Sequence, residues 1–143
     1  MKKSDQKELE QRIADIVADA YRADEETVRE FLRRKVGRWL VATLLGEPGK
    51  PNLAKADAYL YKKAKLDNLD MLRVEECYLS ARIINELRFI EKDIDRNVAR
   101  NWLKMPCLHL EDHAPICAIR DGRSYGHLTA VGAAKTFLFR QIK

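Results

Sequence analysis

Apolar residues recur every three or four positions along most of this 143-residue chain, and that spacing is typical of amphipathic helices. Glycine and proline, which interrupt helices, occur only six and four times. Alternation of apolar and polar residues, the pattern of a half-buried strand, is scarce. The sequence therefore predicts an all-α fold, a compact bundle of about six or seven helices. Hydrophobic residues make up 46% of the chain, enough to form a core.

The apolar stripes and the capping residues give the approximate positions of these helices. In the first half of the chain we expect helices over residues 5–22, over 24–45 with Asp24 as the N-cap, and over 53–65 with Asn52 as the N-cap. In the second half we expect helices over residues 68–90, over a short stretch between Asp95 and Pro106, from Pro115 to Gly122 with Asp112 or His113 as the N-cap, and from Ser124 onward. We divide the chain into a basic N-terminal helical region, residues 1–66, and a second helical domain, residues 67–143.

Positive charge is concentrated in one part of the chain. Residues 29–65 hold ten lysines and arginines against three acidic residues, a local net charge of +7, whereas the whole chain carries +5. Such a block attracts phosphate by counterion release, although a solvated helix face has the same composition. Within the expected helix over 24–45, Arg34 and Arg38 are one turn apart and can bridge phosphates. The predicted DNA-binding residues are Arg33, Arg34, Lys35 and Arg38.

No helix-turn-helix pattern surrounds these cations. The loop that follows, residues 46–51, is longer and stiffer than the turn of that motif, because it contains two prolines and two glycines. Contact with phosphate is therefore expected, but recognition of a particular base sequence is not.

Four residues near the C-terminus are of types that bind zinc. They are Cys107, His109, His113 and Cys117. Their spacing lacks the paired cysteines of common zinc sites, and Pro115 interrupts the cluster. A cysteine–histidine nucleophile is an enzymatic alternative, but no third residue that would orient the pair is evident. We therefore expect no metal, no cofactor and no enzymatic activity.

Nothing in the sequence points to export or to a membrane. Three cysteines are an odd and sparse set for a secreted disulfide scaffold. The chain opens with Met1-Lys2-Lys3-Ser4-Asp5 and continues as a charged helix, unlike a signal peptide. No apolar run reaches bilayer length. We expect a cytoplasmic protein without a membrane partner.

From Leu72 onward, several short stretches resemble a known family. They are Met71-Leu72-Arg73-Val74-Glu75-Glu76-Cys77-Tyr78-Leu79-Ser80-Ala81, then Val98-Ala99-Arg100-Asn101-Trp102-Leu103-Lys104-Met105-Pro106, then Leu110 and Pro115, and then Ala118-Ile119-Arg120-Asp121-Gly122. Over roughly residues 70–140 the chain is similar to the toxin-binding C-terminal domain of the Xre/MbcA/ParS antitoxins. It departs from the family at Glu111-Asp112-His113-Ala114, which lacks the usual glycine, and in its last helix, which lacks acidic residues and a late glycine.

The resemblance implies a homodimeric antitoxin that holds a cognate, NAD-consuming toxin inactive and represses its own operon by binding operator DNA. From charge and expected exposure, we place the toxin contact on Arg120, Arg123, Tyr125, His127, Arg140 and Lys143. The alternative that the basic block favours is a free-standing nucleic-acid-binding transcriptional regulator without a toxin partner.

Overall fold

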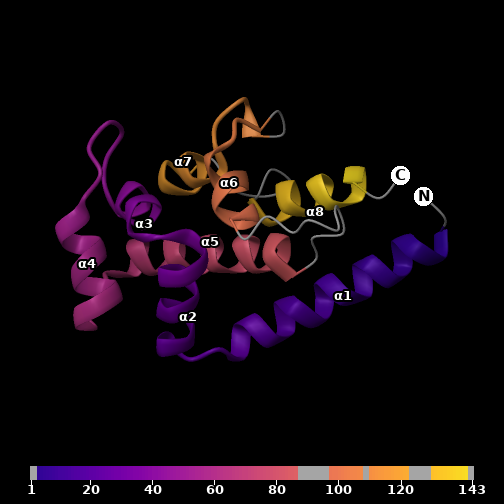
Figure 1. Cartoon of the computed structure of the whole chain (residues 1–143), viewed down its shortest axis with the longest axis horizontal. Coiled ribbons are helices and arrows are strands. Elements are labelled where there is room, and N and C mark those ends of the chain that lie inside the picture. Colours follow the sequence, from indigo (N-terminus) through magenta and orange to yellow (C-terminus); the bar gives the residue numbers. More distant parts are fainter. Residues whose placement is uncertain (1–2, 87–96, 108–109, 123–129, 142–143) are drawn as a thin grey trace.

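A computed structural model describes residues 3–86, 97–107, 110–122 and 130–141, and these residues form an all-α fold without named strands. The elements are α1 (Lys3–Arg22), α2 (Glu25–Phe31), the π-helical segment η1 (Leu32–Val36), α3 (Arg38–Leu45), α4 (Leu53–Lys62), α5 (Asn68–Glu86), α6 (Val98–Lys104), α7 (Pro115–Arg120) and α8 (Ala130–Gln141) (Figure 1). The predicted fold class is thus confirmed. None of the helices in the described ranges combines the length and the apolar character that a bilayer crossing needs.

Helix α5 lies at the centre of the fold. It packs against α1, η1, α3, α6, α7 and α8, and Figure 1 shows it running between α1 on one side and α6 and α8 on the other. A single hydrophobic core joins the two halves of the chain, with members such as Ile13, Leu44, Ile84 and Leu103. The division that we predict after residue 66 falls between α4 and α5, and this core extends across it.

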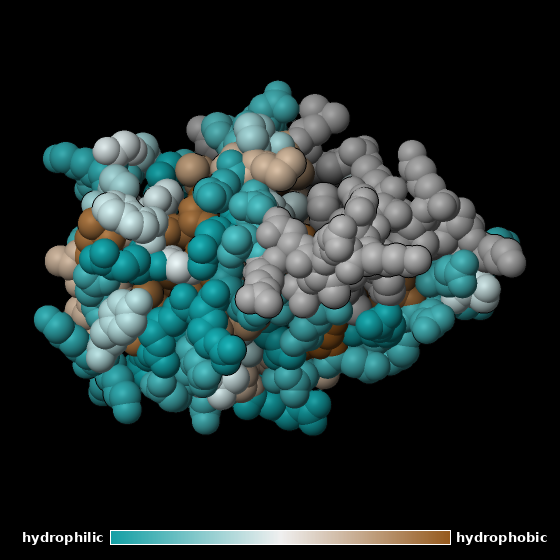
Figure 2. Space-filling view, in the orientation of Figure 1, coloured by the Kyte–Doolittle hydropathy of each residue, from teal (hydrophilic) through white to brown (hydrophobic). Residues whose placement is uncertain are grey.

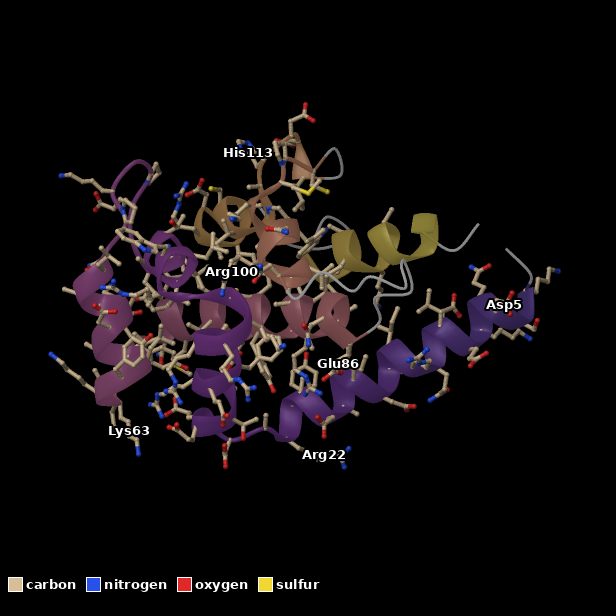
Figure 3. All side chains as sticks on the ribbon, in the orientation of Figure 1. Asp5, Arg22, Lys63, Glu86, Arg100 and His113 are labelled. Carbon is tan, nitrogen blue, oxygen red and sulfur yellow. The ribbon has the colours of Figure 1, made fainter. Side chains whose placement is uncertain are left out.

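The helix expected over residues 24–45 is interrupted, which corrects the prediction and accounts for the additional helix. After α2 the chain continues as the π-helical segment η1, which is wider than an α-helix, and this segment ends at Gly37. The φ of Gly37 is 95°, a conformation that suits a residue without a Cβ atom. Arg100 reaches this junction from α6 (Figure 3) and donates a hydrogen bond from Nε to the carbonyl oxygen of Val36, 2.9 Å away. A Cβ atom on Gly37 would lie 3.3 Å from the Arg100 guanidinium. The interruption is therefore held by a residue from the other half of the chain.

Several predicted helix boundaries are confirmed. Asp24 accepts a hydrogen bond from the backbone N–H of Thr27 at 2.8 Å, and Asn52 accepts one from that of Lys55 at 3.0 Å, as N-caps do. Pro115 opens α7, and Gly122 follows the helix with a φ of 70°. The expected cap of α7 is wrong, because Ala114 occupies that position and makes no side-chain hydrogen bond there. The expected boundaries at Ile90, Asp95 and Ser124 lie outside the described residues.

A buried carboxylate connects three helices. Asp70, at the start of α5, pairs with Lys55 of α4 at 2.8 Å and with Arg73 at 2.9 Å. Arg73 in turn donates from Nε to the backbone carbonyl oxygen of Arg120, at the end of α7, at 3.0 Å. Since a buried charge needs partners, these contacts fix α4 and α7 relative to α5.

Candidate nucleic-acid interface

The four predicted DNA-binding residues lie on two different elements. Arg33, Arg34 and Lys35 belong to η1, whereas Arg38 opens α3 on the other side of Gly37. The expectation that Arg34 and Arg38 lie one turn apart on one continuous helix is therefore wrong.

Arg33 and Arg38 instead reach across to α4. Arg38 forms a two-pronged ion pair with Asp57, from Nε to Oδ1 at 2.9 Å and from Nη2 to Oδ2 at 2.6 Å. Arg33 donates to the backbone carbonyl oxygen of Leu60 and pairs with Glu26 at 2.9 Å. These contacts hold both guanidinium groups in place, and they neutralise part of their charge.

Each of these arginines lies beside an exposed aromatic ring. The guanidinium carbon of Arg38 is 5.6 Å from the centre of the Trp39 ring, and that of Arg33 is 6.0 Å from the Tyr61 ring. Trp39 is 62% exposed and Tyr61 57% exposed, large values for such rings. Tyr61 follows Asp57, the partner of Arg38, by one helical turn on α4, so the two ring–cation pairs are neighbours. We call Trp39, Arg38, Tyr61 and Arg33 the aromatic–arginine row.

Neither ring is a functional candidate by sequence pattern. Trp39 adjoins an apolar stripe and Tyr61 lies in a run of packing residues, so both resemble core positions. The available signal was that each ring has basic neighbours in the chain: Arg38 directly precedes Trp39, and Lys62 directly follows Tyr61.

Lysines at the end of α4 add positive charge beside the row. The pKa of Glu26 is lowered first by its hydrogen bond with Arg33 and further by nearby Lys63. The pKa of Asp57 is lowered first by its hydrogen bond with Arg38 and further by nearby Lys62. Both lysines are exposed, and Lys63 lies at the outer end of α4 with its amine directed away from the bundle (Figure 3). Figure 2 shows one face of the molecule, on which hydrophilic side chains dominate and hydrophobic patches lie near α3 and α4. The surface therefore combines cations with exposed apolar groups.

The structure describes the side chain of only one of the predicted partner-binding residues, Arg120. The exposure expected of Arg120 is wrong, because the residue is only 8% exposed and its side chain pairs with Asp121 at 2.8 Å. This hydrogen bond is the main cause of a raised Arg120 pKa. Of the remaining predicted contacts, Arg140 belongs to α8 but its side chain is not described. The others lie outside the described residues: Arg123, Tyr125, His127 and Lys143.

The four residues of zinc-binding types, for which we expect no metal, lie only partly within the described residues. The backbones of Cys107 and His113 are joined by a hydrogen bond from N–H to carbonyl oxygen at 3.1 Å, whereas His109 lies outside. Within the ranges that can be described, no three histidine, cysteine, aspartate or glutamate side chains gather as metal ligands would. Cys77 is fully buried, and burial raises the pKa of its thiol to about 12.

An apolar groove lies on another part of the surface, where α1, α2, α5 and α8 meet. Its volume is about 650 Å³, and its walls include Val17, Val28, Leu79 and Val131. Two further lining residues are strongly exposed, Tyr21 at 78% and Leu72 at 61%. Leu72 also borders a smaller hollow of about 330 Å³ beside α7. Exposed apolar side chains around a groove are typical of sites that bind another molecule.

Comparison of the chain with protein-family models, with curated proteins and with solved structures found no match.

Proposed function

We propose that this protein binds nucleic acid through the surface formed by η1, α3 and α4. The observation that carries the proposal is the aromatic–arginine row, in which two exposed rings each lie beside a guanidinium group. Guanidinium and ammonium groups bind phosphate, and exposed aromatic rings stack on bases. Lys62 and Lys63 extend the positive charge beyond the row.

A solvated helix face would also explain the charges of this surface, but it gives no reason for the two rings. Single exposed hydrophobic residues are ordinary. Here, however, two large rings are more than half exposed on neighbouring elements, each next to an arginine that an acidic residue holds in place. The combination favours a binding surface over a merely solvated one.

The internal ion pairs set the expected strength of binding. Glu26 and Asp57 compete with phosphate for Arg33 and Arg38, so we expect moderate affinity that falls as salt is added. Ion pairs that water can reach are weak, and phosphate can therefore displace the carboxylates.

Fluorescence anisotropy with labelled oligonucleotides over a range of salt concentrations tests the proposal. The double variant Lys62→Ala/Lys63→Ala should weaken binding and lower the salt-dependence slope by about 2, because each lysine neutralises one phosphate in the complex. Lys7→Ala/Lys104→Ala removes the same charge from exposed positions on α1 and α6 and should have little effect. Equal losses of affinity in the two double variants, or no binding by the unaltered protein, would contradict the proposal.

A second candidate function is that of an antitoxin-like protein that binds a cognate toxin. The apolar groove supports it, because the exposed Leu72 lies on α5 in the half of the chain that resembles the antitoxins. We propose the toxin as the occupant of this groove and a homodimer as the state of the protein. Light scattering would measure the dimer.

Co-expression with the product of the neighbouring gene tests the second candidate. Toxicity of that product, relieved by a complex that co-purifies, is the expected result. Leu72→Glu should break the complex, whereas Met105→Glu, at another exposed apolar residue on the end of α6, should not. A harmless neighbour that does not co-purify would overturn this candidate.

A further inference from the structure

We infer that the nucleic acid bound at the aromatic–arginine row is single-stranded, with unpaired bases stacked on Trp39 and Tyr61. The inference rests on the proposed function, which names nucleic acid but leaves the state of the strand open.

The exposure of the two rings is the first argument. In a duplex each base is stacked between its neighbours, so its flat faces are not accessible to a protein side chain. Unpaired bases offer these faces, and stacking on an aromatic side chain contributes about 1–3 kcal/mol per base. Trp39 and Tyr61 expose more than half of their surface, so their rings are accessible to a base without any change in the fold.

The arrangement of cations and rings is the second argument. Arg38 lies 5.6 Å from the Trp39 ring centre, and Arg33 lies 6.0 Å from that of Tyr61. Each ring thus has its own phosphate-binding group close by, and a single strand likewise carries a phosphate beside each base. Protein surfaces that bind single strands combine these two kinds of residue.

The two ring–cation pairs are also close enough to act on one strand. Arg38 pairs with Asp57, and Tyr61 follows Asp57 four residues later on α4, about 6 Å along the helix axis. The pKa of Arg38 is raised mainly by its hydrogen bond to Asp57, and Tyr61 adds to the shift. Tyr61 therefore lies within the electrostatic reach of Arg38 as well as beside Arg33.

The local fold argues against reading of the duplex major groove. A recognition helix projects from the protein and places several polar side chains on base edges. Here η1 ends at Gly37, and Arg33 is bound to the carbonyl oxygen of Leu60 on the adjacent α4. Arg33 of η1 and Arg38 of α3 are thus held against α4. Since the row consists of stacking and phosphate-binding groups, we expect little preference for sequence.

The test is titration with single strands of about 15 nucleotides, oligo(dT) and oligo(U), and with a DNA duplex of equal length. Anisotropy measures affinity, and tryptophan emission reports stacking because Trp39 is exposed whereas Trp102 is 5% exposed. We expect tighter binding of at least one single strand than of the duplex, with quenched emission. A preference between the two strands would distinguish DNA from RNA as the ligand.

Substitutions of the rings make the test specific. Trp39→Ala and Tyr61→Ala should each weaken single-strand binding about tenfold, and Trp39→Phe should retain most of it. Tyr21→Ala is the matched control, since Tyr21 is an even more exposed aromatic residue on α1 outside the row. Circular dichroism of each variant would show that the fold is intact.

The outcomes separate this inference from the function on which it rests. Duplex binding that equals or exceeds single-strand binding, and that depends on Lys62 and Lys63 but not on the rings, would overturn the inference and leave the proposed function standing. Equal losses of affinity in Trp39→Ala and Tyr21→Ala would also overturn it. Absence of binding to all three probes would contradict both this inference and the proposed function.

Discussion

The Nε atom of Arg100 donates a hydrogen bond to the carbonyl oxygen of Val36 across 2.9 Å, and 64 positions of sequence separate the two residues. The contact lies where η1 ends and α3 begins. Because the helix is interrupted at Gly37, the carbonyl oxygen of Val36 needs a partner from elsewhere, and the Arg100 side chain of α6 provides it. The orientation of α3, which carries Arg38 and Trp39, thus depends on a residue outside the basic region.

Replacement of Gly37 by alanine should destabilise the protein by about 1–3 kcal/mol. The backbone has a φ of 95° there, and the new methyl group would lie 3.3 Å from the Arg100 guanidinium. Urea denaturation followed by circular dichroism would measure the change. Gly49→Ala is a suitable control, because its φ is 74° but no atom lies within 4 Å of the added methyl group. A destabilisation no larger in Gly37→Ala than in Gly49→Ala would show that the Arg100 contact has no part in the effect.

Replacement of Asp57 by asparagine should strengthen the binding of nucleic acid several-fold. The variant removes the carboxylate that occupies Arg38, so that guanidinium becomes available to phosphate. Anisotropy titrations at low salt would measure the gain in affinity. Asp5→Asn, at an exposed position on α1, removes the same charge away from the row. A similar gain in both variants would indicate that only the overall charge matters.

Replacement of Tyr59 by phenylalanine should stabilise the protein at neutral pH, by about 1 kcal/mol. The Tyr59 hydroxyl is buried and has no hydrogen-bond partner among the described residues, so its removal relieves a desolvation cost. Chemical denaturation at pH 7 would measure the difference. A clear loss of stability would mean that the hydroxyl is hydrogen-bonded in solution.

The same residue makes stability depend on alkaline pH. Burial raises the Tyr59 pKa from 10.0 to about 12, so the folded state keeps the hydroxyl protonated while the unfolded state ionises above pH 10. This contribution is complete below pH 10 and is lost as the pH rises towards 12. Stability of the unaltered protein should therefore fall in that window, and the fall should be smaller in Tyr59→Phe. Cys77, with a pKa raised to about 12 by burial, contributes a fall of the same sign in both proteins.

Replacement of Asp70 by alanine should destabilise the protein by about 1–3 kcal/mol, because it removes the buried partner of Lys55 and Arg73, although water can solvate these two partly exposed cations in its place. Asp57→Ala is the matched comparison, since Asp57 also pairs with a cation from another helix but at a more exposed site, where such pairs contribute little to stability. Thermal denaturation of the two variants would rank them. Equal melting temperatures would show that burial of the Asp70 side chain does not strengthen its pairs.

Features set by neighbouring residues were accessible from the sequence. The caps Asp24 and Asn52 act on backbone groups three residues away, and Pro115 opens a helix by the geometry of its own ring. In each case the cause and the effect lie within one turn of the chain.

Features that depend on distant residues were not accessible. The apolar repeat continues through Gly37, and only Arg100, far along the chain, shows why the helix stops there. The prediction of Arg38 as a binding residue rests on charge in the sequence. Its pairing with Asp57 and the exposure of Tyr61 depend on how α3 and α4 pack. Arginine usually lies on the surface of a protein, yet Arg120 is buried where α7 meets α5. Such positions require the tertiary arrangement.

The central position of α5 has a consequence for biosynthesis. Helices α1–α4 leave the ribosome first, but the core that they share with α5 and α6 includes residues made only later, such as Ile84 and Leu103. Until these emerge, the parts of the first helices that pack on α5 and α6 remain uncovered, and exposed apolar surface in a nascent chain promotes aggregation. A chain whose translation stalls near residue 66 should therefore become a client of chaperones or proteases.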